Sequence, residues 1–220
     1  MKKTILKRLA ALALTAGLCL SFAGAVDSKP FSDVEENDWY YYAVAMAYDV
    51  GYMNGYPDGT FRPNSTITRA ECVSIIDRMA DPTIPIGQEI RFEDVSSDAW
   101  YNPAASVCGQ VMGGTSIQYI QSHPLGYIAY FYPERACTRE DFAYGLSNVL
   151  NLPDVGGSGF DDYSQINPEY ADAIMLLRHN GIINGDGVGR YGHFHPKDTI
   201  TRAEVAQIIT NYVQWNISNH

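Results

Sequence analysis

One short motif occurs three times in this chain, and its residue types are suited to binding an anion. It reads Thr-Arg-Ala-Glu at residues 68–71 and 201–204, and Thr-Arg-Glu-Asp at residues 138–141. An arginine presents a planar fork of donors that fits a carboxylate, and the free N–H groups at a helix start add further donors. The motif therefore predicts that Arg69, Arg139 and Arg202 bind a carboxylate.

The threonines and acids of the motif have a structural explanation of their own. Thr-x-x-Glu before an apolar run is a capping box, which pairs the first N–H groups of a helix. The arginine lies at the positive end of the helix dipole, which is mildly unfavourable. An alternative to ligand binding is therefore that each arginine pairs with an acid of a neighbouring copy, such as Asp33, Asp94 or Asp162. The expected capping residues are Thr68, Glu71, Thr138, Asp141, Thr201 and Glu204.

The motif belongs to a longer internal repeat, whose copies span residues 31–80, 92–151 and 160–214. Each copy opens on a Phe-x-Asp segment and continues through a helical stretch, a Gly-rich turn and a second helix. The second copy carries extra residues at about 115–130, which we expect as a loop insertion because insertions cost least in loops. A two-helix unit cannot bury its apolar face alone, so the copies should share one core in a mainly α fold.

The first residues are typical of a secretory signal peptide, residues 1–25. A basic start precedes an apolar stretch at residues 9–20, and Ala23-Gly24-Ala25 is suited to cleavage. The signal contains four of the 15 Lys and Arg residues, which leaves 11 against 25 Asp and Glu and a net charge of −14 (11 − 25). This balance argues against nucleic acid or anionic membranes as partners. We expect no membrane insertion after signal cleavage.

The cysteines and histidines do not predict a metal centre or an enzyme. Three cysteines beyond the signal, with no CxxC spacing, are best explained as small buried hydrophobes: Cys72, Cys108 and Cys137. His193 and His195 form an H-x-H pair that can bind metal, but they flank a repeat turn, which favours surface or core histidines. No Ser-His-Asp arrangement, HExxH motif or Walker loop is present. We expect no metal, no cofactor and no enzymatic activity.

The repeated blocks resemble the S-layer homology domain, which usually occurs as three tandem copies. In the first copy the likeness covers Phe31-Ser32-Asp33-Val34, residues 55–63 and residues 67–71. The resemblance implies helix-loop-helix repeats in a pseudo-threefold arrangement around a central helical bundle. It also implies non-covalent binding to a peptidoglycan-linked secondary cell-wall polysaccharide, often carrying pyruvate, which would anchor the secreted protein at the bacterial cell surface.

The resemblance implies a role for each residue type in these blocks. The arginines would contact the pyruvate carboxylate, and the aspartates would hydrogen-bond sugar hydroxyls. The tryptophans would pack at the groove against a sugar face, although a buried structural tryptophan is an equal alternative. The glycines would let the backbone approach the glycan. The expected glycan-binding residues are Arg69, Arg139, Arg202, Asp33, Asp94, Asp162, Trp39, Trp100, Gly55, Gly114 and Gly185.

A second hypothesis is a structural component or adaptor of the surface layer that acts through contacts with other surface proteins. It is motivated by a chain that ends at His220, soon after the third copy, with no region expected as a cargo domain. Its docking surface would be Tyr40-Tyr41-Tyr42 or the insertion of the second copy. The copies also differ, because the second carries the insertion and the third has Glu169-Tyr170 in place of the Trp-Tyr pair.

Overall fold

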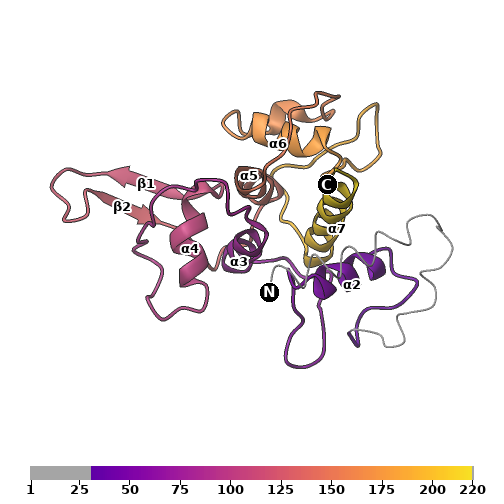
Figure 1. Cartoon of the computed structure of the whole chain (residues 1–220), viewed down its shortest axis with the longest axis horizontal. Coiled ribbons are helices and arrows are strands. Elements are labelled where there is room, and N and C mark those ends of the chain that lie inside the picture. Colours follow the sequence, from indigo (N-terminus) through magenta and orange to yellow (C-terminus); the bar gives the residue numbers. More distant parts are fainter. Residues whose placement is uncertain (1–30, 220) are drawn as a thin grey trace. The chain divides into compact units, whose positions relative to one another are not determined.

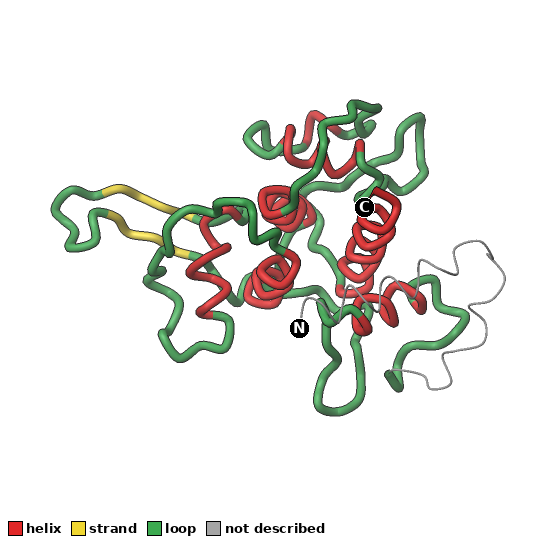
Figure 2. The backbone as a smooth tube through the Cα atoms, in the orientation of Figure 1, coloured by secondary structure: helices red, strands yellow, loops and turns green. Residues whose placement is uncertain are grey.

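The computed structural model describes residues 31–219 and is mainly helical, as predicted (Figures 1 and 2). The pseudo-threefold arrangement of the repeats stays a prediction. The expected signal peptide, residues 1–25, lies outside these described residues. The helices are α2 (Tyr41–Asp49), α3 (Arg69–Met79), α4 (Asn102–Cys108), α5 (Arg139–Val149), α6 (Ala171–His179) and α7 (Arg202–Asn219). The 3-10 helices are η2 (Gly109–Val111) and η3 (Tyr163–Gln165), and the strands are β1 (Ser116–Tyr119) and β2 (Tyr127–Tyr130).

The described chain divides into two compact units. The first combines residues 31–64 with residues 202–219, and in it α2 packs against α7. The second comprises residues 65–201, where α3 packs against α4 and α5, and α5 packs against α6. The pairs α2–α7, α4–α3 and α6–α5 each join the first helix of one copy to the second helix of another copy. The repeats are therefore interleaved within each unit.

The residues just before the three motifs form a closed ring of backbone hydrogen bonds in the second unit. The N–H of Ile67 donates to the carbonyl of Ile200 at 3.1 Å. The N–H of Ile200 donates to Cys137 at 3.0 Å, and that of Cys137 donates back to Ile67 at 2.9 Å. All three residues are fully buried. The ring pairs backbone groups that would otherwise be costly to bury, and it uses the equivalent residue of every copy.

The insertion of the second copy contains a β-hairpin where we expected a loop. Strands β1 and β2 pair antiparallel, and the N–H of Gly126 donates to the carbonyl of His123 to close the turn between them. Tyrosine and isoleucine, which favour strands, occur in both halves. The His123-Pro124-Leu125-Gly126 segment has proline and glycine where a type I turn favours them. These two signals were sufficient to predict the hairpin.

The core includes the three cysteines of the described chain, which are buried free thiols as predicted. Burial raises the pKa of the Cys72 thiol well above its ordinary value. Burial also raises the pKa of Cys108 to about 12, with a contribution from the neighbouring Asp77. Between residues 31 and 219, no helix combines the length and the apolar character needed to cross a bilayer.

The Tyr40-Tyr41-Tyr42 stretch is not the exposed surface that the sequence predicted. Tyr40 and Tyr41 are buried, whereas Tyr42 is 67% exposed. Tyr40 directly precedes α2 and Tyr41 is its first residue, so the helical turn directs consecutive side chains to different faces. Only one tyrosine of the three is available to a partner.

Candidate functional site

The guanidinium group of Arg69 is buried against the backbone of the second copy. Its Nε donates to the carbonyl of Phe131 at 2.8 Å, and its Nη1 donates to the carbonyl of Gly113. Its Nη2 donates to Thr115 Oγ1 at 3.1 Å, and its Nη1 lies 3.4 Å from the carboxylate of Asp141. Burial raises the pKa of Asp141, while the charge of Arg69 acts in the opposite direction. Arg69 is therefore held by interactions within the protein.

The other two motif arginines make the same contact. Arg139 Nε donates to the carbonyl of Phe194 at 2.7 Å in the second unit. In the first unit Arg202 Nε donates to the carbonyl of Phe61 at 2.7 Å, and Nη2 donates to that of Asn54 at 2.7 Å. Arg202 is 5% exposed, whereas Arg139 is half-buried. Arg139 thus has more access to solvent than either of its counterparts.

The N–H groups at the helix starts are already paired. At the start of α3, the N–H of Arg69 donates to Arg135 at 2.9 Å and that of Ala70 donates to Pro133 at 3.0 Å. At the start of α5 the N–H of Arg139 donates to Asp198 and that of Glu140 donates to Pro196, and at the start of α7 the N–H of Ala203 donates to Pro63. The expectation that free N–H groups would join the arginine on one ligand carboxylate is therefore wrong.

The aspartates of the Phe-x-Asp segments bind the backbone of three Phe-x-Pro turns. These turns are Phe61-Arg62-Pro63, Phe131-Tyr132-Pro133 and Phe194-His195-Pro196. The two oxygens of Asp33 accept from the N–H groups of Phe61 and Arg62, both at 2.7 Å. The same two-pronged contact recurs, at 2.7–2.8 Å, from Asp94 to Phe131 and Tyr132 and from Asp162 to Phe194 and His195. The middle residue of each turn has a positive φ, 57° at Arg62, 58° at Tyr132 and 55° at His195. The carboxylates stabilise a left-handed backbone conformation that residues other than glycine rarely adopt.

One peptide group in each turn therefore lies between opposite charges. In the peptide group between Phe61 and Arg62, the N–H of Arg62 donates to Asp33 while the carbonyl of Phe61 accepts from Arg202. Hydrogen bonds to charged groups contribute about 1.5–3 kcal/mol each, more than neutral ones. The alternative in which an arginine pairs with Asp33, Asp94 or Asp162 takes this indirect form, with a peptide between the two charges. Arg69 also pairs directly with Asp141 of the second copy. The observed contacts give these residues a structural role, and direct contact with a glycan stays a prediction.

The helix caps at the first two motifs follow the local pattern. Thr68 Oγ1 accepts from the N–H of Glu71 at 3.2 Å, and the Glu71 carboxylate accepts from the N–H of Thr68 at 3.0 Å. This reciprocal pair is a capping box. Thr138 Oγ1 accepts from the N–H of Asp141 at 3.2 Å. Capping by Thr201 and Glu204 at the start of α7 stays a prediction.

The two repeat tryptophans are exposed, which excludes the alternative of a buried structural role. Trp39 is 62% exposed and Trp100 is 65% exposed. Each indole packs edge-on against the tyrosine that follows it, with ring centroids 5.3 Å apart. In the third copy the corresponding tyrosine, Tyr170, stacks on Tyr144 at 4.2 Å. The first two copies therefore each present a large aromatic ring to solvent just before the helix start.

Gly55, Gly114 and Gly185 lie where other parts of the protein come too close to leave room for a side chain. A side chain at Gly55 would overlap the ring of Phe31. One at Gly114, which has a φ of 73°, would lie 2.9 Å from Nη1 of Arg69. One at Gly185 would lie 2.9 Å from the backbone of Gly192. Contact between these glycines and a glycan stays a prediction.

Comparison with known proteins identifies the repeats. The family model described as "S-layer homology domain" matches residues 30–72 and 159–206. The chain carries S-layer homology domains. The matched ranges belong to the first and third copies. The second copy is the divergent one, and its Asp94–Phe131 and Arg69–Phe131 contacts repeat those of the other two copies.

Three curated relatives extend the similarity over most of this chain. The surface-layer 125 kDa protein of Lysinibacillus sphaericus is 26% identical over 208 residues, 93% of this chain and 16% of its own length. S-layer protein EA1 of Bacillus anthracis is 29% identical over 202 residues, 90% of this chain and 21% of its own. Cell surface glycoprotein 1 of Acetivibrio thermocellus is 35% identical over 172 residues, 74% of this chain and 7% of its own. The chain thus spans about a fifth or less of each relative.

Proposed function

We propose that this chain attaches to the bacterial cell surface by binding a secondary cell-wall polysaccharide without a covalent bond. The S-layer homology match and relatives named as surface-layer or cell-surface proteins support this proposal. The matched part is a small share of each relative, which is typical of an attachment module that accompanies other functions. The predicted signal peptide, residues 1–25, agrees with an exported location.

The exposed tryptophans are the structural observation that carries the proposal. Trp39 and Trp100 lie at equivalent positions of two copies, and each leaves most of its ring in solvent. Exposing so large an apolar surface forgoes the free energy that burial would bring. An aromatic face can instead pack on the C–H groups of a sugar ring. We therefore assign glycan stacking to the first and second copies, where the tryptophans are present.

We assign the arginines two different roles. Arg69 and Arg202 are buried and fix the Phe-x-Pro turns, so they act as positioning residues. Arg139 is half-buried, so it is the motif arginine with the most access to an external carboxylate. A ketal-linked pyruvate presents such a carboxylate, and the arginine fork is suited to binding it in a bidentate manner. A local cation is needed because the whole chain has a net charge of −10.

Calorimetry with a pyruvylated disaccharide tests this assignment. Trp39→Ala, Trp100→Ala and Arg139→Ala should each weaken binding while the protein stays folded. For Arg139 the loss of a charged hydrogen bond, about 1.5–3 kcal/mol, corresponds to about 10–150-fold in affinity. Tyr42→Ala is the matched control, since Tyr42 is an equally exposed aromatic outside the repeated blocks. The assignment fails if the three variants bind as tightly as the control.

A second candidate function is protein–protein docking through the β1–β2 hairpin. This hairpin lies outside the residues matched by the family model and exposes apolar side chains. Tyr119 is 82% exposed, Leu125 46% and Tyr130 40%. If the hairpin docks onto another copy, light scattering will show a dimer that Tyr119→Ser dissociates. A monomer at every concentration would rule out this self-association.

A further inference from the structure

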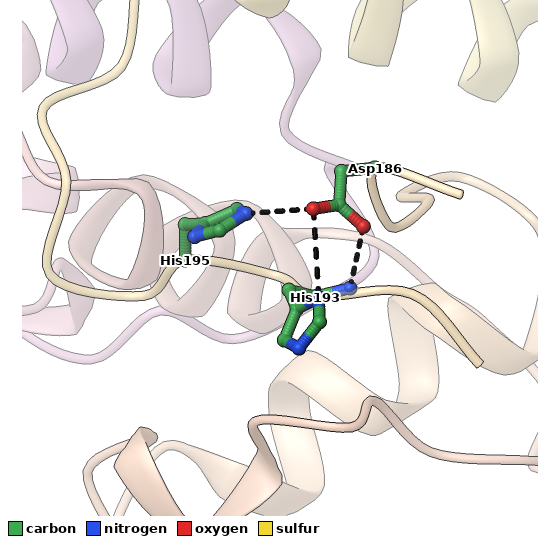
Figure 3. A group of neighbouring side chains, drawn as sticks. All are labelled: Asp186, His193 and His195. Carbon is green, nitrogen blue, oxygen red and sulfur yellow. Dashed lines mark hydrogen bonds and ion pairs between the residues drawn. The ribbon is translucent and has the colours of Figure 1, made fainter. Parts of the chain in front are cut away.

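Three side chains of the third copy converge in the loop that precedes α7 (Figure 3). Asp186 Oδ2 lies 3.0 Å from His195 Nε2 and 3.5 Å from His193 Nδ1. The three atoms that could bind a metal lie within 4.8 Å of one another. Among residues 31–219, this is the one such group of three or more histidine, cysteine and acidic side chains.

The loop backbone holds the carboxylate of Asp186 in place. Its Oδ1 accepts from the N–H groups of His193 and Val188, both at 2.9 Å. These two hydrogen bonds, followed by that of the His195 ring, lower the pKa of Asp186 below its ordinary value. Oδ2 faces the two imidazoles (Figure 3). A second carboxylate, Asp161, accepts from the N–H of Tyr191 in the same loop and adds negative charge there.

We propose that Asp186, His193 and His195 form a binding site for a divalent transition metal ion such as Zn²⁺. Zinc takes imidazole nitrogens and carboxylate oxygens at about 2.0–2.2 Å, which places tetrahedral ligand atoms roughly 3.3–3.5 Å apart. The two separations from Asp186, 3.0 and 3.5 Å, lie around that value. Calcium and magnesium prefer sites made of oxygen ligands alone.

The site is open to an ion from solvent. The side chain of Asp186 is 31% exposed, that of His193 34% and that of His195 47%. The exposed imidazoles can rotate to close the remaining distance, and water can complete the coordination. The proposal does not rest on glycan binding, because none of the three ligands is assigned to the glycan. The two sites are close, since Arg139 donates to the carbonyl of Phe194 between the two histidines.

The first copy builds the same turn with different chemistry and so provides an internal comparison. There Asp58 accepts from Thr60 and pairs with Arg62 Nη2 at 2.8 Å. Thr60 and Arg62 flank the turn phenylalanine just as the two histidines do in the third copy. In the second copy the flanking residues are Tyr130 and Tyr132, whose rings stack at 6.0 Å. The turn is common to the copies, and the set of metal ligands is particular to the third.

Titration calorimetry with ZnCl₂, on the purified chain without a polyhistidine tag, tests the site. We expect one ion per chain. The double variant His193→Thr, His195→Arg restores the residues of the first copy, where the ion pair with aspartate shows that this combination fits the turn. We expect it to lose at least about tenfold in affinity, since even changes outside the ligands cost about 10–100-fold at metal sites.

His123→Ala is the control, because His123 lies in the turn of the β-hairpin and should leave the affinity unchanged. NMR of the histidine rings gives a second measurement that needs no variant, in which Zn²⁺ should shift the signals of His193 and His195 and not that of His123. The proposal is overturned if the wild-type chain binds no Zn²⁺, if the double variant binds as the wild type does, or if only His123 responds.

Discussion

Replacing Arg69 with alanine should destabilise the protein even when no ligand is present. The buried guanidinium donates to the carbonyls of Phe131 and Gly113 and to Thr115, and it lies beside the carboxylate of Asp141. Alanine would leave these acceptors without a donor inside the second unit. A residue whose only role is to bind a ligand would have no such effect.

The size of the loss follows from these contacts. Each hydrogen bond to a charged group contributes about 1.5–3 kcal/mol, so the two carbonyl bonds alone account for about 3–6 kcal/mol. The substitution also removes the cation that pairs with Asp141. Breaking a buried ion pair costs about 3–5 kcal/mol. Both figures describe the loss of the same guanidinium, so we do not add them and take their overlap, about 3–5 kcal/mol, for the whole substitution. For a chain of 150–250 residues this lowers Tm by about 6–20 °C.

Thermal unfolding followed by circular dichroism gives the measurement. Arg69→Lys should have an intermediate effect, because one ammonium keeps the charge but cannot reproduce the planar fork. Arg91→Ala is the matched control, since the Arg91 side chain is exposed, and it should change stability by no more than about 0.5 kcal/mol. If Arg69→Ala melts together with Arg91→Ala, the structural role of the motif arginine is refuted.

Three further predictions concern a glycine, a carboxylate and the thiols. Gly55→Ala should cost about 1–3 kcal/mol in urea unfolding, because the added methyl group overlaps the Phe31 ring, whereas Gly159→Ala, with only ordinary contacts, should not. An NMR titration should give Asp58 a pKa of about 2, and Thr60→Val and Arg62→Ala should each raise it towards 3.8 by removing a donor to the ionised form. The stabilising contribution of that carboxylate is then present above pH 3.8 and lost as the pH falls towards 2, and a wild-type pKa near 3.8 would contradict the contacts. Cys72, Cys108 and Cys137 should resist thiol reagents in the native chain and react in urea, so rapid labelling of the native protein would contradict their burial.

Features that depend on residues close together in the sequence could be predicted from it. The capping box at Thr68 and Glu71 is such a case, because both partners lie in one helical turn. The burial of Cys72 and Cys137 followed from apolar residues at the same places in the other copies. The hairpin of the second copy was missed because the turn at residues 123–126 was treated as part of a loop.

The hydrogen-bond partners of the motif arginines could not be predicted from the motif. The acceptor of Arg69 is the carbonyl of Phe131, 62 residues away, and the sequence does not indicate which backbone oxygens lie within reach. The role of Asp33 was missed for the same reason, since its partners are the N–H groups of Phe61 and Arg62. A positive φ at a non-glycine residue such as Arg62 also has no sequence signal.

The sequence did not decide whether the tryptophans are buried or exposed, for a different reason. Tryptophan is common both in cores and at binding surfaces, so its presence at Trp39 did not decide between them. The structure decides, because the following residue, Tyr40, takes the buried position and the indole remains in solvent. At the start of α2, two consecutive residues therefore differ in environment, because Trp39 is exposed and Tyr40 is buried.

Sedimentation with cell-wall preparations tests the proposed attachment most directly. The purified chain should pellet with native walls that retain their secondary polysaccharide, and it should remain in solution with walls from which that polymer has been extracted. The variant carrying Trp39→Ala and Trp100→Ala should pellet less than the wild type with native walls. Equal binding of the wild-type chain to native and extracted walls would contradict attachment through the secondary polysaccharide.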